Sequence, residues 1–201
     1  ASEHGKSVDS LIVYVHWLMI VLFFGWMLYF VYALIRFRST KHPKADHVGL
    51  RSHVTTWIEG GVALVEAILL IALAVPLWAK VVEDFPAEGQ STVLRVTAQQ
   101  FNWNARYPGK DGTFGKQNVS LISVTNKFGI HPDDQASKDD VTAPVNEIAV
   151  PVNKPVVIYL TSMDVIHSFK LYPQRVNQDA IPGMSIPTHF KPTREGKFQI
   201  V

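Results

Sequence analysis

The 201 residues contain no cysteine, which excludes a disulfide framework and any thiolate metal site within this sequence. Basic residues are also not in excess. The formal net charge of +2 at pH 7 argues against nucleic acid as a partner. A glycine-rich phosphate loop, an HExxH zinc motif and internal repeats are absent as well. What remains informative is the distribution of apolar residues.

The first long apolar run is LIVYVHWLMIVLFFGWMLYFVYALI, residues 11–35, which contains no charged residue. A helix rises about 1.5 Å per residue, so this run is long enough to cross a hydrocarbon core of about 30 Å. Tryptophan and tyrosine side chains within it are suitable anchors at the membrane interface. We predict a transmembrane helix over residues 11–37, with a buried helix of a soluble protein as the alternative.

A second apolar run, GGVALVEAILLIALAVPLWA, covers residues 60–79 and predicts a second transmembrane helix over residues 54–80. It contains Glu66, and Pro76 lies near its end. A carboxylate facing lipid is costly, so Glu66 should face protein or water.

Charge asymmetry predicts the orientation of the two helices. The connecting segment, residues 38–53, and the residue positions beside it are rich in cations and contain one acid, Asp46; the cations are Arg36, Arg38, Lys41, Lys44 and Arg51. Because cationic loops stay in the cytoplasm, residues 38–53 should be cytoplasmic. The N-terminal segment 1–10 and the C-terminal region should then lie outside, in the periplasm of a bacterium.

From residue 91 onward the sequence has the pattern of a β domain. Short runs rich in β-branched and aromatic residues alternate with Gly, Pro, Asn and Asp clusters. The runs predict strands within residues 92–103, 118–124, 146–152, 155–162 and 194–201, and residues 130–146 read as an exposed polar loop. We therefore predict an all-β sandwich or Greek-key barrel over residues 91–201.

Three stretches resemble subunit II of the haem–copper oxidase family, most closely its cytochrome c oxidase branch. They are AQQFNWNARYPG at 98–109, PVNKPVVIYLTSMDVIHSF at 151–169 and DAIPGMSIPTHFKPTREGKFQIV at 179–201. The resemblance covers essentially the whole chain. It implies a membrane α plus all-β fold class, with a two-helix transmembrane hairpin followed by a cupredoxin-like Greek-key β-barrel.

The same resemblance implies a binuclear copper centre, CuA, in the β domain. One ligand would be His167; in the family the remaining ligands are two cysteines, a second histidine, a methionine and a backbone carbonyl on one C-terminal loop. The printed sequence contains only the His167 ligand, and we expect the others to follow Val201. Without the flanking motifs, His167 would read as an ordinary histidine at a strand end.

Resemblance also implies roles in electron transfer. Electrons would enter through Phe101 and Trp103, whose spacing would place both rings on one face of a strand. Asp164 would belong to the docking surface for cytochrome c, and Asp179 would contact subunit I. Five further acids could add to the docking field: Asp133, Asp134, Asp139, Asp140 and Glu147. The four acids within residues 133–140 read instead as a solvated loop.

A proton-uptake role is implied for the second helix. Glu59 and Glu66 are seven residues apart, so they share one helix face, about 10 Å apart along the axis. We expect Glu59 to supply a proton channel of subunit I and Glu66 to lie deeper at the same interface. Two acids satisfied by neighbouring helices are the alternative.

The resemblance implies subunit II of an aa3-type cytochrome c oxidase in a bacterial inner membrane. The complex would couple oxygen reduction to water with proton pumping, using haem and a second copper site in another subunit. Implied partners are subunits I and III, lipid, and cytochrome c or a dedicated cytochrome donor. The alternatives are a copper-free quinol oxidase subunit II and a two-span β-domain module for binding or assembly.

Overall fold

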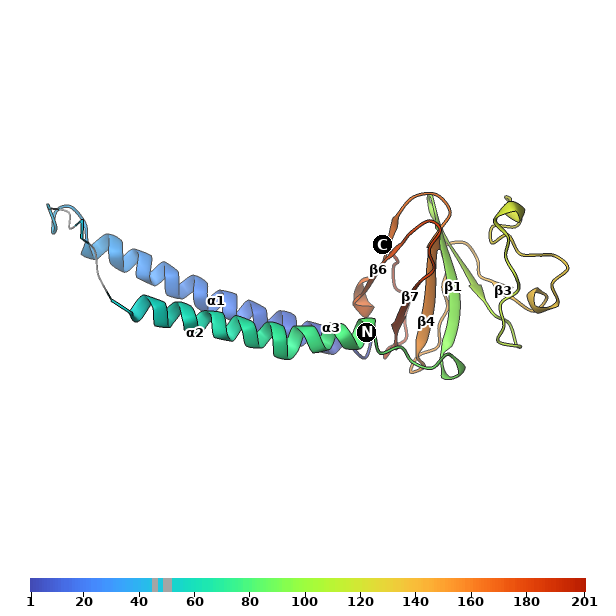
Figure 1. The fold of residues 1–201 in the computed structure, drawn as a ribbon, viewed down its shortest axis with the longest axis horizontal. Helices are drawn as coiled ribbons and strands as arrows, with labels where there is room; N and C mark the ends of the chain where they lie inside the picture. The colour runs from blue at the N-terminus through green and yellow to red at the C-terminus, as the bar shows by residue number, and fades with distance from the viewer. Residues whose placement is uncertain (45–46, 49–51) are drawn as a thin grey trace. The chain divides into compact units, whose positions relative to one another are not determined.

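The computed structural model describes residues 1–44, 47–48 and 52–201 (Figure 1). The chain divides into two compact units: Ser7–Ala79, and Ala1–Lys6 together with Lys80–Val201. The predicted cytoplasmic segment 38–53 includes Asp46 and Arg51 of the charge argument, which lie outside the described residues.

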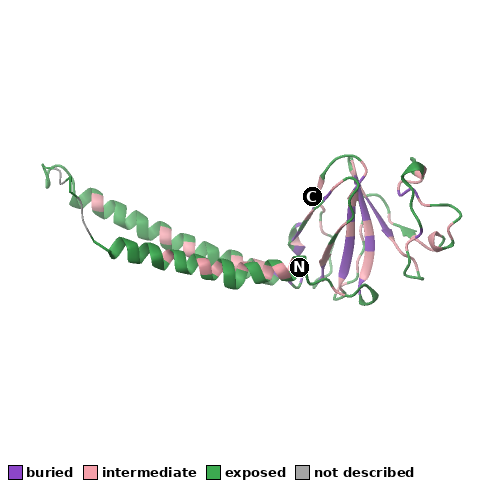
Figure 2. Cartoon of the chain, viewed as in Figure 1, coloured by how far each residue is buried: buried purple, intermediate pink, exposed green. Residues whose placement is uncertain are grey.

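The apolar runs form helices. Helix α1 covers Gly5–Arg36, and the second run is a continuous helical stretch made of α2 (Val54–Ile68), η1 (Leu69–Ala74) and α3 (Val75–Val82). Both are long and apolar enough to cross a membrane, and no residue of either apolar window is buried within the chain. Figure 2 accordingly colours most of both helices as exposed. Apolar side chains exposed along the whole helix are what lipid contact requires.

The segment η1 is a π-helix, and its cause lies in the sequence. Pro76 has no N–H to donate to the carbonyl four residues earlier, so the regular helical ladder is interrupted there. Next to the proline, the backbone N–H of Val75 bonds instead to the carbonyl of Leu70, five residues earlier. The helix thus continues through Pro76 to Val82.

Seven strands form two sheets in the β domain. The five-stranded sheet has the order β3-β2-β1-β4-β7, and the two-stranded sheet pairs β5 with β6. The strands are β1 (Thr92–Gln99), β2 (Asn102–Tyr107), β3 (Val141–Thr142), β4 (Val156–Ser162), β5 (His167–Leu171), β6 (Val176–Ala180) and β7 (Ile186–Phe190). The central strands β1 and β4 are parallel, and the other pairs are antiparallel.

The hydrophobic core lies between the sheets. It is built from apolar residues of β1, β2 and β4 to β7, of which Leu94, Ile158 and Phe169 are fully buried. These strands carry the β-branched and aromatic residues that favour pleated, half-buried positions. The purple strands of Figure 2 mark this core.

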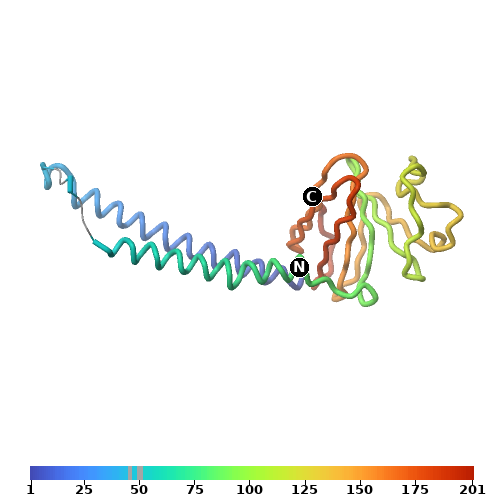
Figure 3. Tube along the Cα trace, viewed as in Figure 1, coloured from blue at the N-terminus to red at the C-terminus, as the bar shows by residue number. Residues whose placement is uncertain are grey.

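The N-terminal residues belong to the β domain. Ser2 forms a β-bridge with Pro192, and Glu3 N donates to Lys191 O at 3.0 Å. The side chains of Ser2 and His4 are buried, and burial lowers the pKa of His4. In Figure 3 the blue N-terminal end lies at the domain that contains the red C-terminal strands. Residues 1–6 therefore pack on the segment that follows β7, as part of the β domain.

Three predicted strands are wrong. Residues 118–124 form a 3-10 turn, η3 (Val119–Leu121), capped by the side chain of Asn118, which accepts from Ser120 N. Residues 146–152 and 194–201 are not strands either. A few β-branched residues favour a strand only when a neighbouring strand and a core are present, and Asn side chains compete by forming turns.

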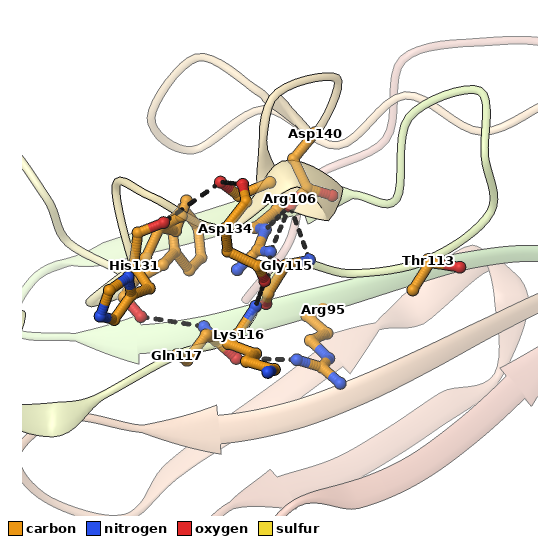
Figure 4. A network of polar contacts seen from close by, with 12 residues as sticks. Arg95, Arg106, Thr113, Gly115, Lys116, Gln117, His131, Asp134 and Asp140 are labelled. Carbon is orange, nitrogen blue, oxygen red and sulfur yellow. Dashed lines mark hydrogen bonds and ion pairs between the residues drawn. The ribbon is translucent and has the colours of Figure 1, made fainter.

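The loop between β2 and β3 is fastened by a buried ion pair that sequence reasoning missed (Figure 4). Arg106 of β2 and Asp140 have side chains 0% and 1% exposed, and both Nε and Nη2 of Arg106 donate to Asp140 Oδ2. Gly115 N donates to the same oxygen at 3.0 Å, and Arg106 Nη2 donates to Gly115 O at 2.9 Å. Asp140 is therefore not part of a solvated acidic loop, because its carboxylate neutralises a buried guanidinium.

Candidate functional site

Three loops meet at one end of the β domain, where β5 begins. The turn between β1 and β2 joins the loop between β4 and β5 through Gln100, and Met163 N donates to Ala98 O at 3.0 Å. The turn between β6 and β7 joins them through a bridge between Ser162 and Pro182. His167 is the first residue of β5 and pairs with Ala180 of β6. Strand pairing thus fixes the backbone of the predicted ligand.

The imidazole of His167 is held by Asp164. Its Nε2 lies 2.7 Å from Asp164 Oδ1, and the two side chains are 18% and 28% exposed. Asp164 also accepts from Gln100 N at 2.7 Å and from Val165 N at 2.7 Å. The hydrogen bonds from His167 and Gln100 hold the pKa of Asp164 well below its usual range. An ionised carboxylate only accepts, so in this hydrogen bond the donor is Nε2 of His167.

Trp103 of β2 packs against this histidine. Its ring lies edge-on to His167, with centroids 6.0 Å apart, and edge-on to Phe169, with centroids 5.2 Å apart. Phe101 is 89% exposed in the turn between β1 and β2 rather than on a strand. The expectation that both rings share a strand face is wrong, because the chain reverses at residues 100–101.

Asp179 lies in β6, opposite Ser168 and one residue before the partner of His167. It is exposed. The turn that follows has Met184 N donating to Ile181 O at 3.2 Å and a φ of +75° at Gly183. Proline followed by a glycine with positive φ is the pattern of a type II turn. Asp179 is therefore a strand residue beside the site, and the turn lies after it.

Glu59 and Glu66 lie on α2 and are exposed within this chain. Both belong to the helical unit of the chain, whereas His167 belongs to the β domain. Their exposure on an apolar helix leaves both carboxylates accessible to a neighbouring subunit.

The site contains few side chains that could bind a metal ion. Among residues 1–44, 47–48 and 52–201, no three His, Cys, Asp or Glu side chains form a group able to hold a metal ion. His167 fits a copper centre as one imidazole ligand, whereas the cysteine ligands that CuA requires are not among the 201 residues. Sequence reasoning missed Phe169, although its position two residues after His167 on β5 indicates the same strand face.

Comparisons with known proteins identify the family of this chain. The family described as cytochrome c oxidase subunit II, periplasmic domain, matches residues 92–200. The alternative cytochrome c oxidase subunit 2 of Bradyrhizobium diazoefficiens is 30% identical over 194 residues, covering 96% of this chain and 69% of that protein. Cytochrome c oxidase subunit 2 of Cereibacter sphaeroides is 26% identical over 203 residues, covering 96% and 67%.

One solved structure to which this chain is similar is the periplasmic domain of cytochrome oxidase subunit II (CoxB) of Bradyrhizobium japonicum. It is 29% identical, with a TM-score of 0.37, and the match covers 58% of this chain and 74% of that chain. The predicted fold class of two apolar helices followed by a cupredoxin-like β domain is confirmed. The family match and the 30% identical relative also confirm the predicted subunit of an oxidoreductase complex: this chain belongs to the cytochrome c oxidase subunit II family.

Proposed function

We propose that this chain accepts single electrons from cytochrome c, or from a dedicated cytochrome, on the periplasmic side of a bacterial inner membrane. It passes them to haem in subunit I of an aa3-type oxidase, with subunit III as a further partner and both termini periplasmic. The observation that carries the proposal is His167, placed by β5 and β6 against Trp103 and held by Asp164 in a domain of this family.

The cofactor would be the binuclear copper centre CuA, with His167 as one ligand. When bound, such a centre accepts and donates one electron at a time. The protein's contribution is a ligand whose position changes little, because its backbone is paired in a sheet and its ring is packed on Trp103. Rigid support of a ligand keeps the geometry nearly constant during electron transfer.

Electrons would reach His167 through Phe101 and Trp103. Phe101 is almost fully exposed where a donor can dock, and Trp103 touches the imidazole. Exposed apolar residues nearby, Val165 and Ile166, enlarge the contact surface. Asp164 supplies negative charge for a lysine-rich donor. Asp179, exposed on β6 beside the site, would contact subunit I.

The test is stopped-flow mixing of the assembled oxidase with reduced cytochrome c, combined with metal analysis. We expect copper beyond that held by subunit I, reduced before haem, at a rate that falls as ionic strength rises. Trp103→Leu should slow this step at least about tenfold, equivalent to about 1.4 kcal/mol, and Phe101→Leu should slow it less.

Three outcomes of this experiment contradict the proposal. A complex that turns over with quinol and has no copper outside subunit I would be a copper-free quinol oxidase. Failure to co-purify with a haem subunit would indicate a binding or assembly module. A reduction rate that ignores ionic strength would remove the docking role of Asp164.

Glu59 and Glu66 would deliver protons to subunit I, with Glu59 nearer the cytoplasm. Both are exposed on α2, and carboxylates at membrane depth persist where they face protein or water. We expect Glu59→Gln and Glu66→Gln to slow haem reduction and oxygen turnover, whereas Glu83→Gln, beyond the end of α3, should not. Unchanged turnover in both helix variants would refute this role.

A further inference from the structure

We propose that Asp164 is the positioning residue of His167. Its carboxylate keeps the imidazole proton on Nε2, so that Nδ1 is the nitrogen offered to the metal. The identity of that metal rests on the proposed function, but the contact between the two side chains does not. Asp164 thus has a structural task inside the site in addition to its charge at the docking surface.

The first observation is the hydrogen bond itself. Nε2 of His167 lies 2.7 Å from Asp164 Oδ1, a distance typical of a charge-assisted bond. Asp164 precedes His167 by three residues, and the intervening loop turns the carboxylate back toward the ring. The bond therefore forms within one short loop and does not depend on a partner chain.

The second observation is that the carboxylate is fixed. Oδ2 accepts from Gln100 N at 2.7 Å, and Oδ1 accepts from Val165 N at 2.7 Å and from Ser162 Oγ at 3.2 Å. Gln100 and Val165 lie in two different loops, so rotation of the carboxylate would break bonds to both. A carboxylate with backbone donors on both oxygens is held in one orientation, so it can orient the imidazole in turn.

The third observation is that the ring also packs against an aromatic side chain. Trp103 packs edge-on against it, and Trp103 is in turn packed on the fully buried Phe169. The imidazole is thus held by one carboxylate and one indole that are each anchored in the domain. A metal that approaches Nδ1 meets a ring with its proton and its orientation already set.

These contacts have a consequence for ligand binding. A neutral histidine exchanges its proton between two nitrogens, and only the nitrogen without the proton can bind a metal. Partners that donate or accept at the second nitrogen fix the tautomer and raise the basicity of the ligand. Loss of such a partner typically weakens metal binding about 10–100-fold.

The experiment measures the tautomer of His167 without any metal. The full chain in detergent, with ¹⁵N-labelled histidine rings, gives separate NMR signals for protonated and unprotonated nitrogens, and His167→Gln assigns the ring. We expect wild type to carry the proton on Nε2 and Asp164→Ala to show both tautomers. Asp139→Ala is the matched control, because Asp139 also accepts two backbone N–H groups but touches no histidine.

A proton on Nδ1 in wild type would overturn the inference, even if Asp164→Ala failed to fold. So would ring signals that are identical in wild type and Asp164→Ala. The second readout is chelator competition in the assembled oxidase, where Asp164→Ala should hold copper about 10–100-fold more weakly. Unchanged copper retention in a variant with mixed tautomers would also contradict it. Absence of copper from wild type, with the tautomer as expected, would refute the proposed function alone.

Discussion

Replacing His167 with alanine should reduce turnover with cytochrome c by more than about 100-fold, because loss of a direct ligand should cost at least as much as loss of an outer contact. His167 is the proposed copper ligand, and Trp103 and Asp164 both contact its ring. The measurements are copper per complex, the electron paramagnetic resonance spectrum, and steady-state oxygen uptake.

Two further variants serve as controls for the effect of His167→Ala. His167→Gln keeps most of the side-chain volume, so a loss shared with His167→Ala reflects the missing ligand rather than a gap beside Trp103. His131→Ala removes an exposed histidine of the same domain and should leave copper and turnover unchanged. Haem reduction by a small chemical reductant should survive in every variant. Full copper content in both His167 variants would show that the residue is not a ligand.

Replacing Asp140 with alanine should destabilise the β domain by about 3–5 kcal/mol, because it leaves the buried guanidinium of Arg106 without its counter-charge. The two side chains are 0% and 1% exposed, and Gly115 also loses the acceptor of its N–H. We expect earlier urea unfolding and faster amide hydrogen exchange in β2 and in the loop from residue 108 to 140.

A double variant separates charge from packing. Arg106→Met with Asp140→Leu removes both ions together, and its stability should return toward that of wild type, since buried pairs are often replaceable by apolar residues. Asp133→Ala changes an exposed acid of the same loop and should have no measurable effect. Equal stability of Asp140→Ala and wild type would mean that the pair contributes nothing to the fold.

Parts of the fold could be predicted because their signals are local and strong. An uncharged run at 11–35 indicates a membrane-length helix whatever surrounds it, and the predicted runs at 92–103 and 155–162 contain the central strands β1 and β4. The weaker runs at 118–124 and 146–152 do not form strands. At 118–124, Val119 and Val124 are 83% and 92% exposed, so no core holds them in a strand.

The candidate site was likewise predictable from the sequence only in part. His167 was predicted from the motif around it, and the structure places it as the first residue of β5. Its partnership with Asp164, the position of Phe101 in a turn and the burial of Asp140 all depend on loops that meet only after folding. Charge patterns in the sequence do not distinguish a solvated acid from one that neutralises a buried cation.

The sequence by itself determined the two apolar spans, the all-β character of the outer domain and membership of the oxidase subunit II family. These follow from hydrophobicity, periodicity and motif order, which are properties of neighbouring residues. Only the tertiary structure decided that Asp164 holds His167, that Trp103 packs on the ring and that Arg106 is neutralised by Asp140. Trp103 and His167, like Arg106 and Asp140, are far apart in the chain, and sheet pairing and loop closure bring them into contact.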